Sequence, residues 1–188
     1  MIKFNAKELR TMPVDAEVAQ SMEKHPVTII LDNVLDTYNV GSIFRLADAV
    51  AAQKVILCGQ TLAPPNSRIK KASINTWQWV DWEYAPTALD AIANLKSQNS
   101  ITKIIAVEQD ARSKPFYTVH YEFPLAIVVG NETNGVSKEV LDMADAIVEL
   151  PMWGINKSLN VMVSCGIILY EILKQKDSVI PAHAGIHG

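Results

Sequence analysis

The sequence lacks any long uninterrupted apolar segment. Apolar residues make up 49% of the 188 residues, yet no run approaches the ~20 residues that a membrane-spanning helix needs. The first ten residues, MIKFNAKELR, contain no apolar core of a signal peptide. We therefore expect a cytoplasmic protein that does not associate with a membrane, and the length suits one domain with short appendages.

Cysteine and histidine are both scarce. The two cysteines, Cys58 and Cys165, lie among apolar residues and form no Cys-x-x-Cys pair, so we interpret them as reduced core residues. The four histidines do not have the spacing of metal ligands, and we predict no metal site. Positive charge is not in excess, because the formal net charge is −3. A chain-wide nucleic-acid-binding surface is therefore disfavoured, whereas a local basic patch is not.

Several enzyme signatures are missing as well. No Gly-Lys-Ser/Thr follows a glycine-rich loop, which excludes a Walker A site. The G-x-G-x-x-G spacing of a dinucleotide fold is absent after the first predicted strand. No nucleophile elbow supports a Ser-His-Asp or Cys-His arrangement, and the carboxylates form no evident catalytic pair.

What the chain does contain is an alternation of buried strands and amphipathic helices. Short apolar, β-branched runs predict strands that are buried on both faces, and these cover 27–31, 54–58, 104–107, 125–129 and 146–150. Apolar residues at helical spacing predict helices over 39–51, 87–95, 137–143 and 158–174. This alternation predicts an α/β domain over 27–176, with a mostly parallel sheet flanked by helices.

Two appendages flank this domain. Residues 1–26 are predicted to form an N-terminal helical arm, because Asn5 and Glu8 have capping-box spacing. Pro13 then interrupts the pattern, and a second short helix is expected to follow it, with Val14, Val18 and Met22 on one face. Residues 177–188 show no periodicity, so we expect a disordered tail.

The last predicted helix, 158–174, is apolar on nearly all of its sides. Such a helix must be covered all round, and a domain of this size has few elements with which to cover it. We therefore expect a homodimer that forms through this C-terminal helix.

Unusual motifs follow the predicted strands. In open parallel sheets, ligands bind beyond the carboxyl ends of the strands, which directs attention to the loops after Leu31, Val107, Val129 and Leu150. One of these loops carries Gly130-Asn-Glu-Thr-Asn-Gly135, and another carries Leu150-Pro-Met-Trp-Gly-Ile-Asn-Lys-Ser-Leu-Asn160. The loop after Leu31 leads into Asn39-Val-Gly-Ser-Ile-Phe-Arg45.

Each motif also has a purely structural explanation. The two glycines of the 130–135 loop suit a tight turn. Asn39 suits a helix N-cap, and Arg45 a solvated helix position. Likewise, Ser158 and Asn160 can cap the final helix, and Met152 can belong to the core.

One basic cluster stands out, formed by Arg68, Lys70 and Lys71. Such a cluster is usually a solvated helix face, and the alternative is contact with RNA phosphates. Four aromatic residues follow it and could stack on bases: Trp77, Trp79, Trp82 and Tyr84.

Taken in order and spacing, the motifs resemble those of the SpoU/TrmH group of SPOUT RNA methyltransferases. The resemblance covers roughly Val27 to Lys174. It implies a deep trefoil knot at the C-terminal end of the domain, S-adenosylmethionine bound within the knot, and a homodimer. It also implies methylation of a ribose 2′-hydroxyl in tRNA or rRNA. The 1–26 arm does not look like the separate RNA-binding domain of many relatives, so neither the RNA nor the nucleotide is identified.

The resemblance also assigns roles to individual residues. It implies cofactor contacts from Val107, Gly130, Leu150, Met152 and Leu159. It implies a catalytic set of Asn39, Arg45, Glu132, Ser158 and Asn160. An arginine keeps its proton, so we expect Arg45 to stabilise a developing alkoxide electrostatically rather than to act as a simple base.

Three other functions remain open at this stage. A SPOUT enzyme can act on a base nitrogen rather than on ribose, and a protein of this fold can bind S-adenosylmethionine or RNA without catalysis. An unrelated α/β nucleotide enzyme is the third alternative. The products of digested RNA separate the first two from ribose methylation, and a comparison of S-adenosylmethionine with NAD and ATP as ligands tests the third.

Overall fold

The structure is a computed structural model that describes residues 4–11, 17, 19 and 21–179. Its centre is one seven-stranded sheet in which every pair of neighbouring strands is parallel. The order across the sheet is β3-β2-β1-β6-β4-β7-β5. The strands are β1 (His25–Asp32), β2 (Ala52–Cys58), β3 (Trp82–Ala85), β4 (Lys103–Val107), β5 (Lys114–Pro115), β6 (Leu125–Gly130) and β7 (Ala146–Glu149). The predicted parallel α/β sheet is thus confirmed.

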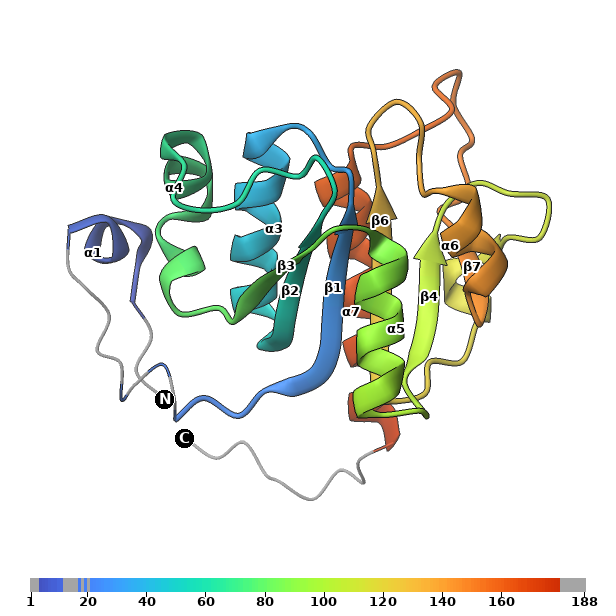
Figure 1. The fold of residues 1–188 in the computed structure, drawn as a ribbon, viewed down its shortest axis with the longest axis horizontal. Coiled ribbons are helices and arrows are strands. Elements are labelled where there is room, and N and C mark those ends of the chain that lie inside the picture. Colours follow the sequence, from blue (N-terminus) through green and yellow to red (C-terminus); the bar gives the residue numbers. More distant parts are fainter. Residues whose placement is uncertain (1–3, 12–16, 18, 20, 180–188) are drawn as a thin grey trace.

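Helices cover both faces of the sheet (Figure 1). One face carries α3 (Thr37–Ala49) and α7 (Val161–Val179), and the other carries α5 (Ala88–Gln98) and α6 (Lys138–Met143). Alternate residues along each strand feed the two cores, so that Ile29 and Leu31 face α3 and α7, whereas Ile30 packs with the α5 side. A strand covered on both faces has to be apolar throughout, which explains the unbroken apolar runs in the sequence.

The order of the strands brings the motif-bearing loops together. The loops predicted to form a ligand edge follow β1, β6, β4 and β7, and these four strands are consecutive neighbours in the sheet. Because parallel strands all end at the same edge, the four loops share one end of the molecule. The deep trefoil knot implied by the family resemblance stays a prediction.

Both cysteines are buried in the core, as the sequence indicated. Burial raises the pKa of the Cys58 and Cys165 thiols to about 12, and the charge of Asp32 adds to the effect at Cys58. Neither side chain is a thiolate near neutral pH, so neither is a nucleophile. Within the described part of the chain, no helix is both long and apolar enough to cross a bilayer.

Some helix boundaries differ from the prediction. Helix α3 begins at Thr37, because the side chain of Asp36 accepts a hydrogen bond from the Tyr38 amide and caps it. The predicted N-cap role of Asn39 is therefore wrong, and Asn39 lies in the first turn. Helix α7 starts at Val161 rather than at Ser158, and it continues to Val179. Residues 177–179 of the expected tail are thus helical, whereas 180–188 lie outside the described residues.

The arm is described only in part. Helix α1 (Ala6–Thr11) is capped by Asn5, whose side chain accepts from the amides of Lys7 and Glu8. The Glu8 carboxylate in turn accepts from the amide of Asn5, which completes the expected capping box. The second short helix cannot be assigned, because Val14 and Val18 lie outside the described residues. The division into arm, domain and tail stays a prediction.

Candidate functional site

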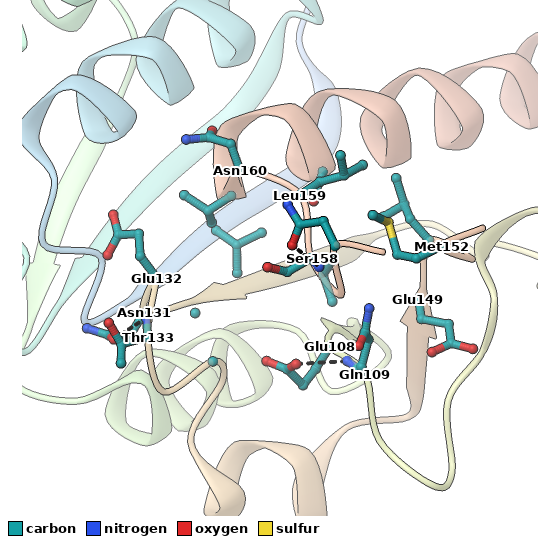
Figure 2. Close-up of a pocket in the computed structure, with 18 residues that line it drawn as sticks. Glu108, Gln109, Asn131, Glu132, Thr133, Glu149, Met152, Ser158, Leu159 and Asn160 are labelled. Atoms are coloured by element: carbon teal, nitrogen blue, oxygen red, sulfur yellow. Dashed lines mark hydrogen bonds between the residues drawn. The ribbon is translucent and has the colours of Figure 1, made fainter. Parts of the chain in front are cut away.

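A cavity of about 430 Å³ lies at the carboxyl edge of the sheet. This volume falls within the ~300–1,000 Å³ typical of small-molecule sites. Its walls are the ends of β4 and β6 and the loops after β4, β6 and β7, together with the first turn of α7 (Figure 2). All five residues expected to contact a cofactor line it: Val107, Gly130, Leu150, Met152 and Leu159.

The catalytic set implied by the resemblance is only partly assembled. Glu132, Ser158 and Asn160 line the cavity. Asn39 does not line it, but hydrogen bonds connect its side chain to both Glu132 and Asn160. Arg45 lies six residues further along α3, where it is exposed and outside the cavity lining.

Glu132 is held by a dense set of donors. Its carboxylate accepts from the Asn39 side chain at 2.9 Å and from the backbone amides of Leu35 and Asp36, each at 3.1 Å. Desolvation alone would raise the pKa of this carboxyl, but the bonds from Asn39 and from the backbone amides outweigh it and lower the pKa. Glu132 is therefore an anion near neutral pH, and it joins the loop after β1 to the loop after β6.

Asn160 has two functions in this arrangement. Its side-chain oxygen accepts from the amides of Met162 and Val163, which caps α7 as the structural explanation predicted. Its side-chain nitrogen donates to Oδ1 of Asn39 at 3.0 Å. One carboxamide therefore caps the helix and also connects it to the other two motifs. Ser158 does not cap α7, because it precedes the helix and lies exposed on the cavity wall.

The glycine of the first motif has a packing function that the sequence did not reveal. A Cβ atom at Gly41 would lie 2.7 Å from the Ala72 side chain and 2.7 Å from the Ile69 carbonyl oxygen. Those residues belong to α4 (Ser67–Ser73), so the glycine allows α3 and α4 to pack closely.

Helix α4 carries the predicted basic cluster. Its Arg68, Lys70 and Lys71 are exposed, while Ile69 is fully buried beneath them. The nearby aromatic residues that were considered for stacking on bases are mostly half-buried. Three of them pack against the core: Trp77, Trp79 and Trp82. Trp79 also donates to Asp48, and Tyr84, which is exposed, donates to the Gly59 carbonyl. Their enrichment after the basic cluster thus has a largely structural explanation.

Sequence reasoning missed several residues of the cavity wall. They are polar side chains next to the predicted positions: Glu108, Gln109, Asn131, Thr133, Glu149 and Asn156. Glu108 and Gln109 directly follow the predicted Val107, so the rule that ligands bind beyond strand ends could have found them.

The lining has an unusual charge. Among the described residues that form the wall, three are glutamates (Glu108, Glu132 and Glu149) and none is lysine, arginine or histidine. Such a wall favours a ligand with positive charge and disfavours a polyphosphate. No group of three or more His, Cys, Asp or Glu side chains in the described part of the chain is arranged to hold a metal ion.

Comparison with known proteins identifies the family. The SpoU rRNA Methylase family matches residues 26–170. A tRNA (guanosine(18)-2′-O)-methyltransferase of Thermus thermophilus is 33% identical over 150 residues, which are 80% of this chain and 75% of the relative. A tRNA (guanosine(18)-2′-O)-methyltransferase of Aquifex aeolicus is 32% identical over 167 residues, covering 86% of this chain and 74% of the relative.

Solved structures agree with the sequence matches. The crystal structure of the A. aeolicus TrmH/SpoU tRNA modifying enzyme aligns with a TM-score of 0.75 and 30% identity, over 93% of this chain and 83% of that one. An AdoMet-bound rRNA methyltransferase from Sinorhizobium meliloti aligns with a TM-score of 0.74 and 28% identity, over 81% of this chain and 57% of that one. With a family match over most of its length, the chain belongs to the SpoU rRNA Methylase family.

Proposed function

We propose that this protein transfers the methyl group of S-adenosylmethionine to a ribose 2′-hydroxyl of tRNA or rRNA. One observation carries the proposal: three motifs distant in sequence meet beside the cavity, and two of them line it. The chain from Asn160 through Asn39 to Glu132 connects them by side-chain hydrogen bonds. Relatives of the same family are named tRNA and rRNA 2′-O-methyltransferases, which supports the same reaction class here.

The cavity suits S-adenosylmethionine on chemical grounds. This cofactor carries a sulfonium and an ammonium group, and the wall offers three carboxylates without a cationic side chain among its described residues. Apolar side chains that can cover an adenine are present too, in Val107, Met152 and Leu159. NAD and ATP carry phosphates, which this wall would repel. A relative that was crystallised with AdoMet supports the assignment.

When bound, S-adenosylmethionine supplies an electrophilic methyl group on a good leaving group. The chain has to exclude water, align the acceptor oxygen and stabilise the charge that develops on it. In this proposal Val107, Met152 and Leu159 limit the access of water. The Glu132–Asn39–Asn160 network is proposed to hold the polar wall rigid. Ser158, which is exposed on that wall, is proposed to contact the ribose.

Arg45 is proposed to act on the RNA side. It is exposed and does not line the cavity, so its guanidinium is accessible to an RNA that binds outside the cavity. Because a guanidinium keeps its proton, it stabilises a developing alkoxide or a nearby RNA phosphate rather than accepting a proton.

RNA is proposed to bind across the α3–α4 pair. Arg45 lies on α3 and the exposed Arg68, Lys70 and Lys71 lie on α4, and the glycine at 41 keeps these two helices in close contact. Cations gathered on one helix pair attract the phosphate backbone without selecting a sequence.

A homodimer is proposed to form through α7. Its inner face is buried at Cys165, Ile168, Leu169 and Ile172. Its outer face leaves Val163, Ile167 and Tyr170 exposed by 39%, 39% and 56%. These three residues recur at helical spacing, so they form one apolar stripe that a second copy can cover. We further propose that the protein works in the cytoplasm. Thiols are kept reduced there, which agrees with two unpaired buried cysteines.

Product analysis tests the proposed reaction. The full chain is incubated with methyl-labelled S-adenosylmethionine and with tRNA or rRNA, and the RNA is digested to nucleosides for mass spectrometry. A labelled 2′-O-methyl nucleoside is expected. A base-methylated nucleoside, or no labelled product from either RNA, would overturn the proposal. The Arg45→Ala variant tests the proposed part of Arg45. We expect it to lose turnover while its affinity for S-adenosylmethionine is unchanged. Near-normal turnover would remove Arg45 from the mechanism.

A further inference from the structure

Glu108 connects two segments of the cavity wall. It follows β4 directly, and its carboxylate is divided between two backbone donors. Oε1 accepts from the amide of Gln109 at 2.8 Å, and Oε2 accepts from the amide of Val136 at 2.9 Å. Val136 directly follows the 130–135 loop. A Cβ atom on Gly135 would lie 2.1 Å from Oε2, so the carboxylate packs directly against this loop.

The next residue, Gln109, reaches the opposite wall. Its side-chain Nε2 donates to the carbonyl of Lys157, which belongs to the loop between β7 and α7. Adjacent residues thus contact one loop each, and the Gln109 amide is itself bound by the Glu108 carboxylate (Figure 2). Asn39 also joins these two loops, but it does so through the side chains of Glu132 and Asn160, whereas Glu108 and Gln109 bind backbone groups.

The 130–135 loop is also held from its other side. The carboxylate of Asp32, at the end of β1, accepts from the amide of Ser137 at 2.9 Å. In the sheet, β6 lies between β1 and β4, so its loop is bound by carboxylates from both neighbouring strands. Val136 is only 4% exposed, and its amide therefore depends on Glu108 in place of water. The hydrogen bonds described for the Asp32 side chain go to Asn33 and Ser137 and none goes to the loop after β7, which distinguishes it from the Glu108–Gln109 pair.

We propose that Glu108 and Gln109 are a positioning pair that sets the separation of the two loop walls, and thereby the affinity for S-adenosylmethionine. This inference rests on the proposed function. In this proposal the pair holds the two loops through hydrogen bonds within the protein. It is a positioning pair and not a catalytic one, since both side chains are already used to hold the loops.

Two variants remove the two halves of the pair. In Glu108→Gln, the size is kept but one oxygen becomes an NH₂ group that faces a backbone N–H. A buried donor left unpaired in this way corresponds to a loss of about ten-fold or more in an equilibrium constant. Gln109→Ala removes the bond to the Lys157 carbonyl together with a side chain that lines the cavity. Glu139→Gln is the matched control, because Glu139 is exposed on α6 and does not line the cavity.

Hydrogen exchange of the ligand-free protein and calorimetric titration with S-adenosylmethionine test the inference together. In Glu108→Gln we expect faster exchange in peptides covering 130–137, and in Gln109→Ala faster exchange over 150–160. Both variants should bind S-adenosylmethionine about ten-fold more weakly, and the double variant should lose less than the product of the two effects because they act through one unit.

Several outcomes overturn the inference. If both variants bind S-adenosylmethionine within about two-fold of the wild-type affinity, the inference is wrong. This holds even if hydrogen exchange is faster in the variants, because loop separation would then not control binding. A fall in thermal stability alone would show a merely structural role. If the wild-type protein itself does not bind S-adenosylmethionine, the proposed function fails instead, and the exchange data then decide by themselves whether the pair couples the loops.

Discussion

The side chain of Asn160 donates a hydrogen bond to Oδ1 of Asn39, 3.0 Å away and 121 residues earlier in the chain. This bond fixes the orientation of the Asn39 carboxamide, because its nitrogen is then left to donate to Glu132. The first turn of α3, the loop after β6 and the start of α7 are thus joined by two side-chain bonds. Displacing any one of the three displaces the polar wall of the cavity.

Asn39→Asp should break this network at its centre. The replacement has nearly the same shape, but it places a carboxylate oxygen against the Glu132 carboxylate, where the native nitrogen donates. We expect a fall in turnover of about ten- to hundred-fold, as for loss of a hydrogen bond to a charged group. The affinity for S-adenosylmethionine should fall less than turnover does, because Asn39 does not line the cavity and acts on its wall only through Glu132 and Asn160. Steady-state kinetics measures this, with Asn94→Asp on the exposed side of α5 as the control; equal turnover in both variants would contradict the prediction.

We expect the contribution of Glu132 to the free energy of unfolding to depend on pH. Its pKa is lowered in the folded protein from an ordinary value of 4.5. A carboxyl with a lowered pKa stabilises the fold fully above its unfolded pKa, and this contribution is lost as the pH falls through the folded pKa. The stability difference between wild type and Glu132→Gln should therefore be largest near neutral pH and should shrink below that ordinary value. Urea unfolding at several pH values measures it, and a difference that is constant with pH would show that the Glu132 charge is not involved.

The sequence predicted the central strands and the ligand edge, because strands buried on both faces are read directly from apolar runs. Val107 and Gly130 were placed correctly at the cavity for the same reason: each ends or follows such a run. The cap of α3 was misplaced, because Asp36 and Asn39 are both good caps and only the folded loop decides between them. Glu108 and Gln109 were missed because a Glu-Gln pair has no motif of its own. Only their position directly after a predicted strand marked them, and the loops that they contact are distant in sequence.

Gly135 and Gly154 offer a matched pair of substitutions in the two cavity loops. Gly135 has a φ of +70°, and an added Cβ would collide with the Glu108 carboxylate. A Cβ at Gly154 would meet nothing within 4 Å. We expect Gly135→Ala to lower the free energy of unfolding by about 1–3 kcal/mol and to weaken cofactor binding. Gly154→Ala should change stability by less than about 0.5 kcal/mol. Thermal unfolding and calorimetry check both, and equal effects of the two substitutions would argue against this description of the loop.

The basic cluster on α4 should govern RNA affinity in a salt-dependent way. Replacing Arg68, Lys70 and Lys71 by alanine removes three exposed charges without touching the cavity. We expect weaker RNA binding at low salt, and a log–log salt slope that becomes shallower by roughly one unit per lost phosphate contact. Lys103→Ala is the control, because Lys103 begins β4 and so lies at the amino end of its strand, away from the ligand edge. An unchanged slope in the triple variant would place the RNA on another surface.

The exposed stripe on α7 leads to a prediction about assembly. Ile167 lies at the middle of the stripe, between Val163 and Tyr170, so a charge there should be buried in any dimer that uses this face. An unpaired buried charge is costly enough to separate the subunits. We therefore expect Ile167→Glu to sediment as a monomer at concentrations at which the wild type is a dimer. Ile101→Glu is the control, because Ile101 is 65% exposed in the turn before β4 and belongs to no such stripe. If both variants remain dimeric, α7 is not the interface; if the wild type is already a monomer, no homodimer forms. A monomeric Ile167→Glu variant that still binds S-adenosylmethionine would further show that the cavity forms within one chain.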